Sequence, residues 1–210
     1  MIKILKKIKK FCTKKNTLYF KYVNSSAAIS RKAKIYNRNN LVMQAYTNID
    51  AGAVIMNTRA KFIMKKYSGA AIGLLVVTGN HMSLVGKHLK QVGDSDKNKE
   101  ANPKLFDKDI IVEEDVWIGA RVTLLYGAHI GRGAIIGAGS VIRSKIPPYS
   151  VVIGNPAKVV GFRFSPQEII NHEQQIYSDD ERMEEKEINT IYDKFFFNRV
   201  AEIKNFVRIY

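Results

Sequence analysis

A period of six residues runs through the middle of the chain and restricts what it can fold into. From Val112 the sequence divides into the units VEEDVW, IGARVT, LLYGAH, IGRGAI, IGAGSV and IRSKIP. The first position is aliphatic in every unit, and the fifth is mostly small or β-branched. The first positions are Val112, Ile118, Leu124, Ile130, Ile136 and Ile142, and the fifth are Val116, Val122, Ala128, Ala134, Ser140 and Ile146. A period of six matches neither the 3.6-residue repeat of a helix nor the two-residue alternation of a strand.

The period indicates a solenoid in which each unit is a short strand followed by a tight corner. The aliphatic residue points into a narrow prism, and glycine suits the corner because it tolerates unusual backbone angles. Successive coils then form parallel ladders with strands about 4.8 Å apart. The chain is therefore predicted to be mainly β.

A weaker form of the pattern precedes residue 61. The expected first positions are Val23, Ile29, Ile35 and Leu41, with Ala27, Ala33 and Ala45 in the small position. The register then slips by two residues, to Ile49 and Ile55 with Ala53 in the small position. Residues 61–82 are rich in β-forming residues but show no clear phase. The solenoid is thus expected over residues 21–164, with irregular early coils.

Composition excludes several classes of protein. Hydrophobic residues make up 46% of the 210 residues and charged residues 25%, the balance of a folded protein. The longest nearly unbroken apolar run, residues 70–77, is too short to cross a membrane. The single cysteine, Cys12, excludes an intrachain disulfide and a cysteine-rich zinc site. The basic N-terminus has no uninterrupted apolar core, so no signal peptide is predicted and a cytoplasmic protein is expected.

The net charge of +15 is unevenly distributed. Residues 1–21 carry eight lysines and no acid, whereas residues 165–210 carry six basic and ten acidic residues. A basic body suits a nucleic acid, an anionic lipid surface or a phosphorylated cofactor. No aromatic-interleaved basic motif points to a nucleic acid, so that partner is not expected.

Two helical appendages are predicted. Residues 1–15, within an N-terminal segment 1–20, form a basic amphipathic helix with Ile4, Ile8 and Phe11 on one face. This helix either binds an anionic membrane, such as the inner face of the cell membrane, or caps the solenoid.

In the C-terminal segment 165–210, the sequence Ser165-Pro166-Gln167-Glu168 is a strong helix start, and the helix is expected to reach about Tyr177. After a charged break, apolar residues recur at helical spacing in a last amphipathic helix, at Phe196, Val200, Ile203, Val207 and Tyr210. This helix is expected to cap the solenoid or pack against another subunit.

The stretch IIVEEDVWIGARVTLLYGAHIGRGAIIGAGSVIRSKIPPYSVVIGNPAKVV resembles the hexapeptide-repeat acyltransferases. More narrowly, it resembles the branch that holds maltose, galactoside, xenobiotic and capsular-polysaccharide O-acetyltransferases. The DVWIG, GAGSV and GNPAK segments carry this resemblance, which covers about residues 20–165. It implies a left-handed parallel β-helix, acetyl-CoA as the acyl donor, and a homotrimer with active sites between subunits.

The resemblance also assigns a catalytic base. Residues 88–109 are polar and lack the period, which predicts an extruding loop over residues 83–109 that lines the site or is a plain surface loop. In relatives, such a loop reaches towards a neighbouring subunit's active site. The Thr-Gly-Asn-His run before it places His81 where the family has its general base. Asn80 and His88 are expected near the substrate, with His88 solvated or positioning the loop rather than acting as a base.

The same resemblance implies a coenzyme A site on the later coils. The GAGSV segment would let the pantetheine arm approach the backbone, Trp117 would lie near the thioester, and basic residues would hold phosphates. These residues are Trp117, Gly137, Ala138, Gly139, Arg143, Lys145, Asn155, Pro156, Ala157 and Lys158. Tight-corner geometry, an apolar plug and solvated charges are the alternative explanations.

A metal site is not expected. The γ-class carbonic anhydrases share the fold and use three histidines, but within the repeats only His129 occurs, without a near partner. His129 is expected to be an exposed turn residue, and His172 is expected to lie on the surface of the C-terminal helix.

The function that the resemblance implies is acetyl-CoA-dependent O-acetylation of a sugar hydroxyl. The acceptor would belong to a bacterial capsule, exopolysaccharide or lipopolysaccharide, and the transfer would be direct, with a histidine as general base. Two alternatives stay open: an N-acetyltransferase of an amino sugar or antibiotic, and a catalytically silent β-helix scaffold.

Overall fold

The computed structural model describes residues 19–100, 102, 105–195 and 197. The predicted helix at residues 1–15 and all but Phe197 of the predicted last helix lie outside these ranges. Within them, no helix is both long and apolar enough to cross a bilayer.

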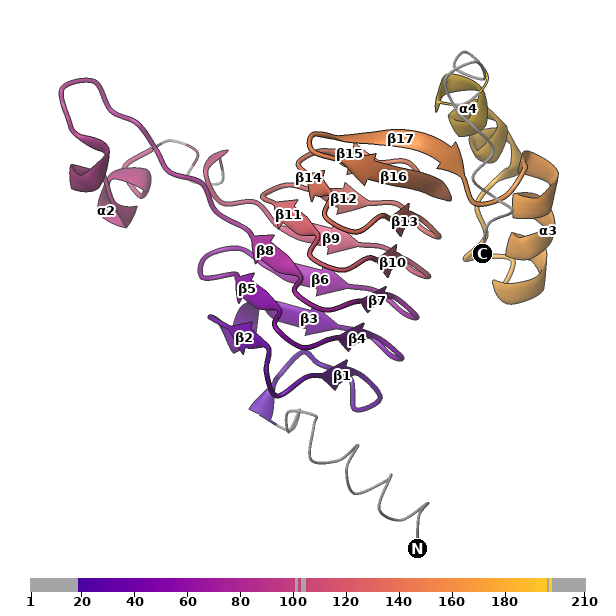
Figure 1. The fold of residues 1–210 in the computed structure, drawn as a ribbon, viewed down its shortest axis with the longest axis horizontal. Helices are drawn as coiled ribbons and strands as arrows, with labels where there is room; N and C mark the ends of the chain where they lie inside the picture. Colours follow the sequence, from indigo (N-terminus) through magenta and orange to yellow (C-terminus); the bar gives the residue numbers. More distant parts are fainter. Residues whose placement is uncertain (1–18, 101, 103–104, 196, 198–210) are drawn as a thin grey trace, which may run out of the picture.

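Three parallel sheets form the body, and each coil of the chain contributes one strand to each sheet (Figure 1). The first sheet contains β1 (Ala28–Ile29), β4 (Asn48–Ile49), β7 (Gly69–Ala70), β10 (Trp117–Ile118), β13 (Ile135–Ile136), β16 (Ser150–Gly154) and β17 (Ala157–Phe162). The second contains β2 (Lys34–Ile35), β5 (Val54–Met56), β8 (Leu75–Val77), β11 (Thr123–Leu125) and β14 (Val141–Ile142). The third contains β3 (Leu41–Met43), β6 (Phe62–Met64), β9 (Ile110–Val112), β12 (His129–Ile130) and β15 (Lys145–Ile146). Among the strand pairs of the described residues, only β16 and β17 are antiparallel.

The six-residue period corresponds to the side chains that fill the prism. Both its first and fifth positions point inward, so each six-residue unit buries two residues, one in the strand and one just before it. Ile118, Leu124, Ile130 and Ile136 expose none of their surface, and Val122, Ala128 and Ala134 are equally buried. The mainly β architecture with parallel sheets is therefore confirmed, together with the inward positions predicted for this stretch.

The early coils follow the same rule with a different phase from the one expected. Met43 pairs with Met64, and Met64 pairs with Val112, so Met43 rather than Leu41 holds the first position. Leu41 is buried in the fifth position instead. Likewise Ile146 pairs with Ile130 and so takes a first position rather than the expected fifth.

The small position before Ile49 was also assigned wrongly. Ala45 lies at a corner and is only partly buried, while Thr47 fills the inward position. Insertions at a corner explain the shifted phase at Met43 and Thr47, whereas the unit between Ile142 and Ile146 is two residues short, which explains the change at Ile146. A fixed six-residue count fails wherever residues are added to or missing from a corner.

All of the upstream insertions occur at the corner between the second and third sheets. The inward residue recurs after eight residues from Ile35 to Met43 and after nine from Ile55 to Met64. The first insertion forms the 3₁₀ turn Arg38–Asn40. Buried Asn57 from the second insertion accepts a hydrogen bond from the Asn37 backbone at 3.1 Å and donates one back at 2.8 Å. The two insertions therefore stack on each other.

The third insertion at this corner is the extruding loop. It leaves between β8 and β9 and carries the short helix α2 (Asp94–Lys97) away from the prism (Figure 1). Its base is closed by two backbone hydrogen bonds, from Asn80 to Phe106 at 2.7 Å and from Lys108 to Thr78 at 2.9 Å. Arg59 from the second insertion anchors it, with Nε 2.9 Å from Asp107 Oδ2.

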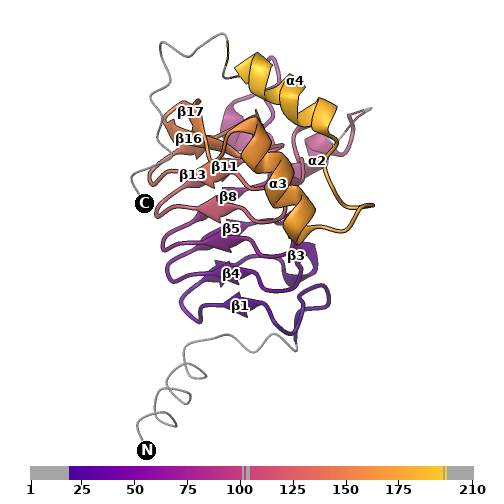
Figure 2. The same cartoon turned by 90° about the vertical axis from the view of Figure 1, so that its right-hand side faces the viewer.

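Two helices cover the C-terminal end of the coil (Figure 2). Helix α3 (Pro166–Ile176) begins at the predicted Ser165 cap, whose hydroxyl accepts from the Glu168 backbone. A charged, non-helical break follows at residues 178–184, but it is shorter than expected, because helix α4 (Glu185–Phe195) begins well before Phe196. Its acidic first turn suits the helix dipole, and Ile188 is buried against the body.

Buried Glu173 joins α3 to the last coil. Its carboxylate accepts hydrogen bonds from the Tyr149 hydroxyl, from Arg132 at 2.9 Å and from the Met183 backbone at 3.0 Å. Burial, and then the bond to Glu173, raises the pKa of the Tyr149 hydroxyl far above its usual range. Tyr149 therefore stays protonated near neutral pH and donates its hydroxyl hydrogen to Glu173.

We predict that Gly131→Ala lowers the free energy of unfolding by about 1–3 kcal/mol, the usual cost of overpacking. A Cβ at Gly131 would lie 2.5 Å from the Pro148 nitrogen and 2.7 Å from the Ile146 oxygen, both backbone atoms of the next coil. Gly93→Ala is the control, because nothing lies within 4 Å of a Cβ there. Chemical denaturation of both variants measures the effect, and equal stability of the two would contradict the tight contact between coils.

Candidate functional site

A groove of about 670 Å³ runs over the outer face of the first sheet. Its floor is a column of outward residues in register across neighbouring strands: Asn48, Gly69, Trp117 and Ile135. Trp117 is 51% exposed, unusual for so large an apolar side chain. A Cβ at Gly69 would lie 2.6 Å from Asn48 Oδ1 and 3.3 Å from the Trp117 ring, so glycine makes room for both side chains.

The C-terminal side of the groove contains most of the residues expected to bind coenzyme A. Gly137 and Ala138 line it, and Gly139 follows at the corner with a φ of +72°. The Gly154 backbone donates to Ser140 Oγ at 3.2 Å, which holds the β16–β17 turn beside this corner. That turn carries Asn155 and Pro156, and Ala157 and exposed Lys158 begin β17. The structure thus brings Trp117, Gly137–Gly139 and Asn155–Lys158 to one sheet and its edge.

Two expected phosphate contacts lie elsewhere. Lys145 is on β15 of the third sheet, directly beside His129. Arg143 is exposed at the corner that joins the second sheet to the third. Neither shares a wall of the prism with Trp117.

His81 is exposed where the extruding loop leaves the prism. Its backbone N–H donates to Asn80 Oδ1 at 2.9 Å, and its ring forms no hydrogen bond with any residue in the described ranges. His88 is exposed farther along the loop, and its backbone N–H donates to Gln91 Oε1 at 3.0 Å. His81 belongs to the corner between the second and third sheets, whereas Gly137–Gly139 lie between the first and second. The width of the second sheet therefore separates the two groups in one chain.

His129 is not the exposed turn residue that was expected. It lies on β12, with Nε2 2.7 Å from Glu113 Oε1, and Lys65 Nζ lies 2.5 Å from Glu113 Oε2. Although burial raises the pKa of the Glu113 carboxyl, the hydrogen bonds from Lys65 and His129 outweigh it and lower that pKa. Sequence reasoning missed this pairing, yet His129 lies one coil after Ile111, so the 18-residue coil repeat places it near Glu113.

A hollow of about 410 Å³ lies between this part of the third sheet and α4. His129, Glu113 and Lys145 line it together with apolar residues of the helix. His129 is thus a second candidate histidine. Unlike His81 it has a carboxylate partner in the described part of the chain, and it lies on a different wall of the prism from the groove.

His172 is also not on the helix surface as expected. It packs between Tyr149 and Phe164, with ring centroids 5.9 and 5.1 Å away, because α3 lies against the last coil. Its Nε2 is buried without a hydrogen bond and lies 3.6 Å from Asp115 Oδ2. A structural role follows from this packing.

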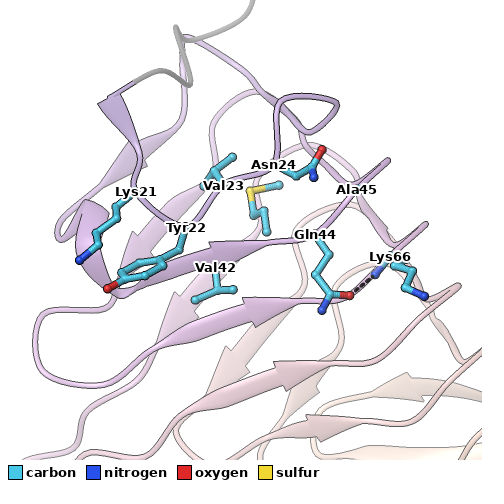
Figure 3. Close-up of a pocket in the computed structure, with 9 residues that line it drawn as sticks. Lys21, Tyr22, Val23, Asn24, Val42, Gln44, Ala45 and Lys66 are labelled. Carbon is cyan, nitrogen blue, oxygen red and sulfur yellow. Dashed lines mark hydrogen bonds between the residues drawn. The ribbon is translucent and has the colours of Figure 1, made fainter.

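Another hollow, of about 470 Å³, lies at the N-terminal coils (Figure 3). Val42 of β3 contributes to it, and the Lys66 backbone donates to Gln44 Oε1 at 3.1 Å. Its lining includes two lysines but no histidine or carboxylate, so it holds no acid–base pair. In the part of the chain that the structure describes, no group of three or more potential ligands is placed to hold a metal ion.

The part of the chain that matches a known protein family includes two of the strands that form the groove. Residues 109–144, which include β10 and β13, match the family described as bacterial transferase hexapeptide (six repeats). A probable macrolide acetyltransferase from Lysinibacillus sphaericus is 45% identical over 64 residues, 30% of this chain and 36% of that protein. The chain thus matches only about a third of the length of its curated relatives.

Solved structures show the same fold over more of the chain. A hexapeptide-repeat acetyltransferase from Vibrio cholerae, in complex with acetyl coenzyme A, has a TM-score of 0.60 at 20% identity, covering 71% of this chain and 74% of that one. A maltose O-acetyltransferase from Clostridium difficile 630 has a TM-score of 0.54 at 18% identity, covering 78% and 86%. The mainly β architecture with parallel sheets and hexapeptide repeats is therefore that of β-helix acetyltransferases.

We predict that Glu113→Gln destabilises the protein at pH 7 and that the difference from wild type disappears in acid. A carboxyl whose pKa is lowered by folding stabilises the fold above its unfolded pKa, 4.5 here, and loses that contribution as the pH falls through the folded value. Urea unfolding between pH 7 and pH 3 measures this, with exposed Glu184→Gln as control. A difference that persists unchanged below pH 4 would contradict an ionic role for Glu113.

Proposed function

We propose that the protein is an acetyl-CoA-dependent O-acetyltransferase acting on a sugar hydroxyl of a bacterial surface polysaccharide. The observation that carries this is the groove beside Trp117 and Gly137, built by the coils that match the transferase family. The related fold from Vibrio cholerae, solved with acetyl coenzyme A, supports the choice of donor. The coil is proposed to be left-handed, as in that family.

In this proposal the pantetheine arm lies against Gly137, Ala138 and Gly139, whose own side chains are absent or small; the Ile153 side chain packs beside Gly137, while the space beside Gly139 is open. The thioester end reaches Trp117, and the Asn155–Ala157 turn and Lys158 receive the nucleotide end. Because Arg143 and Lys145 stand on other walls, they contribute only if a neighbouring subunit shares the cofactor.

His81 is proposed as the general base. The acceptor oxygen attacks the thioester carbonyl while the imidazole removes the hydroxyl proton. The C–S bond then breaks, and the proton passes from the imidazolium to the leaving thiolate. Imidazole suits this exchange because it ordinarily titrates near neutrality, and backbone N–H groups at a corner would stabilise the oxyanion. Asn80, whose side chain contacts the His81 backbone, and His88 on the loop are proposed to face the acceptor.

The active sites are proposed to lie between the subunits of a homotrimer. One subunit cannot join His81 to its own groove, because the second sheet separates them. That sheet also presents partly exposed apolar side chains outward, among them Val54, Leu75 and Val141. A neighbouring copy would bury them and place its groove beside His81.

A drug hydroxyl is a second candidate acceptor. The 45% identity with a probable macrolide acetyltransferase favours it, although the match covers 64 residues. Competition between a macrolide and a polysaccharide acceptor in one assay separates the two.

The reaction is proposed to occur in the cytoplasm, with residues 1–15 touching the inner membrane face or capping the coil.

We predict that His81→Ala lowers kcat by about 10²–10⁴, the usual contribution of general base catalysis. Coenzyme A affinity should stay near the wild-type value. His129→Ala is the control and should change kcat only a few-fold, and His88→Ala should also have a mild effect on kcat because His88 is proposed to face the acceptor without acting as the base. Near-normal turnover by the His81 variant, or a large loss with His129→Ala alone, would assign the base elsewhere.

Mixed trimers test where the site lies. His81→Ala removes the base, and Ala138→Trp fills the groove, so each variant alone should be inactive. In co-expressed random trimers about a quarter of the interfaces pair an intact His81 with an intact groove, and activity should return to about that fraction. Light scattering checks the trimer. An active monomer, or mixed trimers without activity, would contradict sites between subunits.

A further inference from the structure

Two exposed tyrosines extend the groove beyond Trp117. Tyr46 and Tyr67 lie on neighbouring coils at the corner between the third and first sheets, and their rings stack with centroids 5.3 Å apart and planes 6° from parallel. They are 63% and 59% exposed. Tyr67 lines the groove together with Trp117, and Tyr46 continues the same edge one coil farther from β17.

Both tyrosines hold a backbone conformation that disfavours them. Their φ angles are +59° and +62°, in the left-handed region where side chains other than glycine, asparagine and aspartate are strained. At the corner between the first and second sheets, Gly52, Gly73, Arg121 and Gly139 occupy the corresponding left-handed positions, and Asp115, Gly133 and Tyr149 do so at the same corner as the two tyrosines in later coils. The left-handed backbone is therefore a general feature of the corners and does not by itself indicate a ligand. Neither tyrosine ring fills the core: the two rings stack on each other, and both stay more than half exposed.

The chemistry of the surface fits a carbohydrate. The face of an aromatic ring carries partial negative charge and attracts the polarised C–H groups of a sugar ring. Asn48, Asp115 and Arg163 line the same groove; Arg163 is ion-paired with Asp115, and the remaining N–H groups and oxygens of these side chains can bond to hydroxyl groups. This mixture of aromatic rings and polar side chains suits a sugar better than a lipid tail, which offers no hydrogen-bonding groups.

We propose that Tyr46, Tyr67 and Trp117 form a platform that binds several consecutive sugar rings, so the acceptor is an oligosaccharide or polysaccharide rather than a single sugar. Neighbouring coils are about 4.8 Å apart, and the three side chains span three coils, about 10 Å, which exceeds one ring. This inference rests on the proposed function and specifies its acceptor: the sugar nearest Trp117 would be acetylated, and Tyr46 would hold a ring farther along the chain.

The test uses Tyr46→Asn and Tyr67→Asn, singly and combined, in the full-length protein. Asparagine removes the ring but accepts the left-handed backbone, so the variants should fold at least as stably as wild type. Tyr36→Asn is the control, because Tyr36 is also exposed, at 48%, but lies at another corner. The probes are maltose and chitin oligosaccharides and α2,8-linked sialic acid oligomers, each from one to six residues long, with binding followed by saturation-transfer NMR.

For wild type and Tyr36→Asn, we expect affinity for at least one of these series to rise tenfold or more between one and four residues. The double variant should lose this gain while keeping its melting temperature and its affinity for coenzyme A.

Three results would overturn the platform. They are a double variant that retains the gain with length, one that instead loses coenzyme A affinity because the rings hold adenine, and a wild type that binds none of the three series. The proposed function fails separately: if His81→Ala retains full turnover while the length dependence stands, the base is wrong and the platform remains.

Discussion

The inward packing of aliphatic side chains in a three-sided coil is the interaction on which the rest of the structure depends. Ile118, Ile136 and Val152 are fully buried one above another, each paired with the next through the parallel ladder of the first sheet. Every coil therefore rests only on its neighbours, as in other repeat proteins. Because the buried inward side chains stabilise the fold, outward residues such as Trp117 are not needed for packing.

The flat walls of this coil explain why its chemical groups are dispersed. A prism has no deep cleft of its own, so groups project from corners or lie on open faces. His81 stands at one corner, the Gly137–Gly139 turn at another, and the Glu113–His129 pair on a third wall. Distance along the chain is a poor guide to proximity here, because residues 18 apart are neighbours while those six apart face different directions.

The regular part of this architecture could be predicted from the sequence and the irregular part could not. The first positions from Val112 to Ile142 point inward as predicted, and the cap at Ser165 starts its helix. The phase of Leu41 and Ala45 was wrong because insertions at one corner shift the count without changing the polarity of the strands. The partners of His129 and His172 depend on contacts between coils or with α3, which no local pattern encodes. For the groove, the glycines and Trp117 were visible in the sequence, but Tyr46 and Tyr67 were not, since nothing local distinguishes their stacked, left-handed geometry.

The extruding loop has a consequence for how the fold is held together. Strands β6 and β9 are direct neighbours in the ladder, with the Ile110 N–H donating to Lys61 at 2.9 Å and the Lys65 N–H donating to Val112 at 2.8 Å. The path of the hydrogen bonds thus passes straight across, while the path of the covalent chain makes a detour. The coils before and after the loop are therefore held together by the hydrogen bonds between β6 and β9 and not by the loop itself. A cut in the loop backbone would leave these hydrogen bonds in place. A longer or different loop would leave the spacing of the coils unchanged.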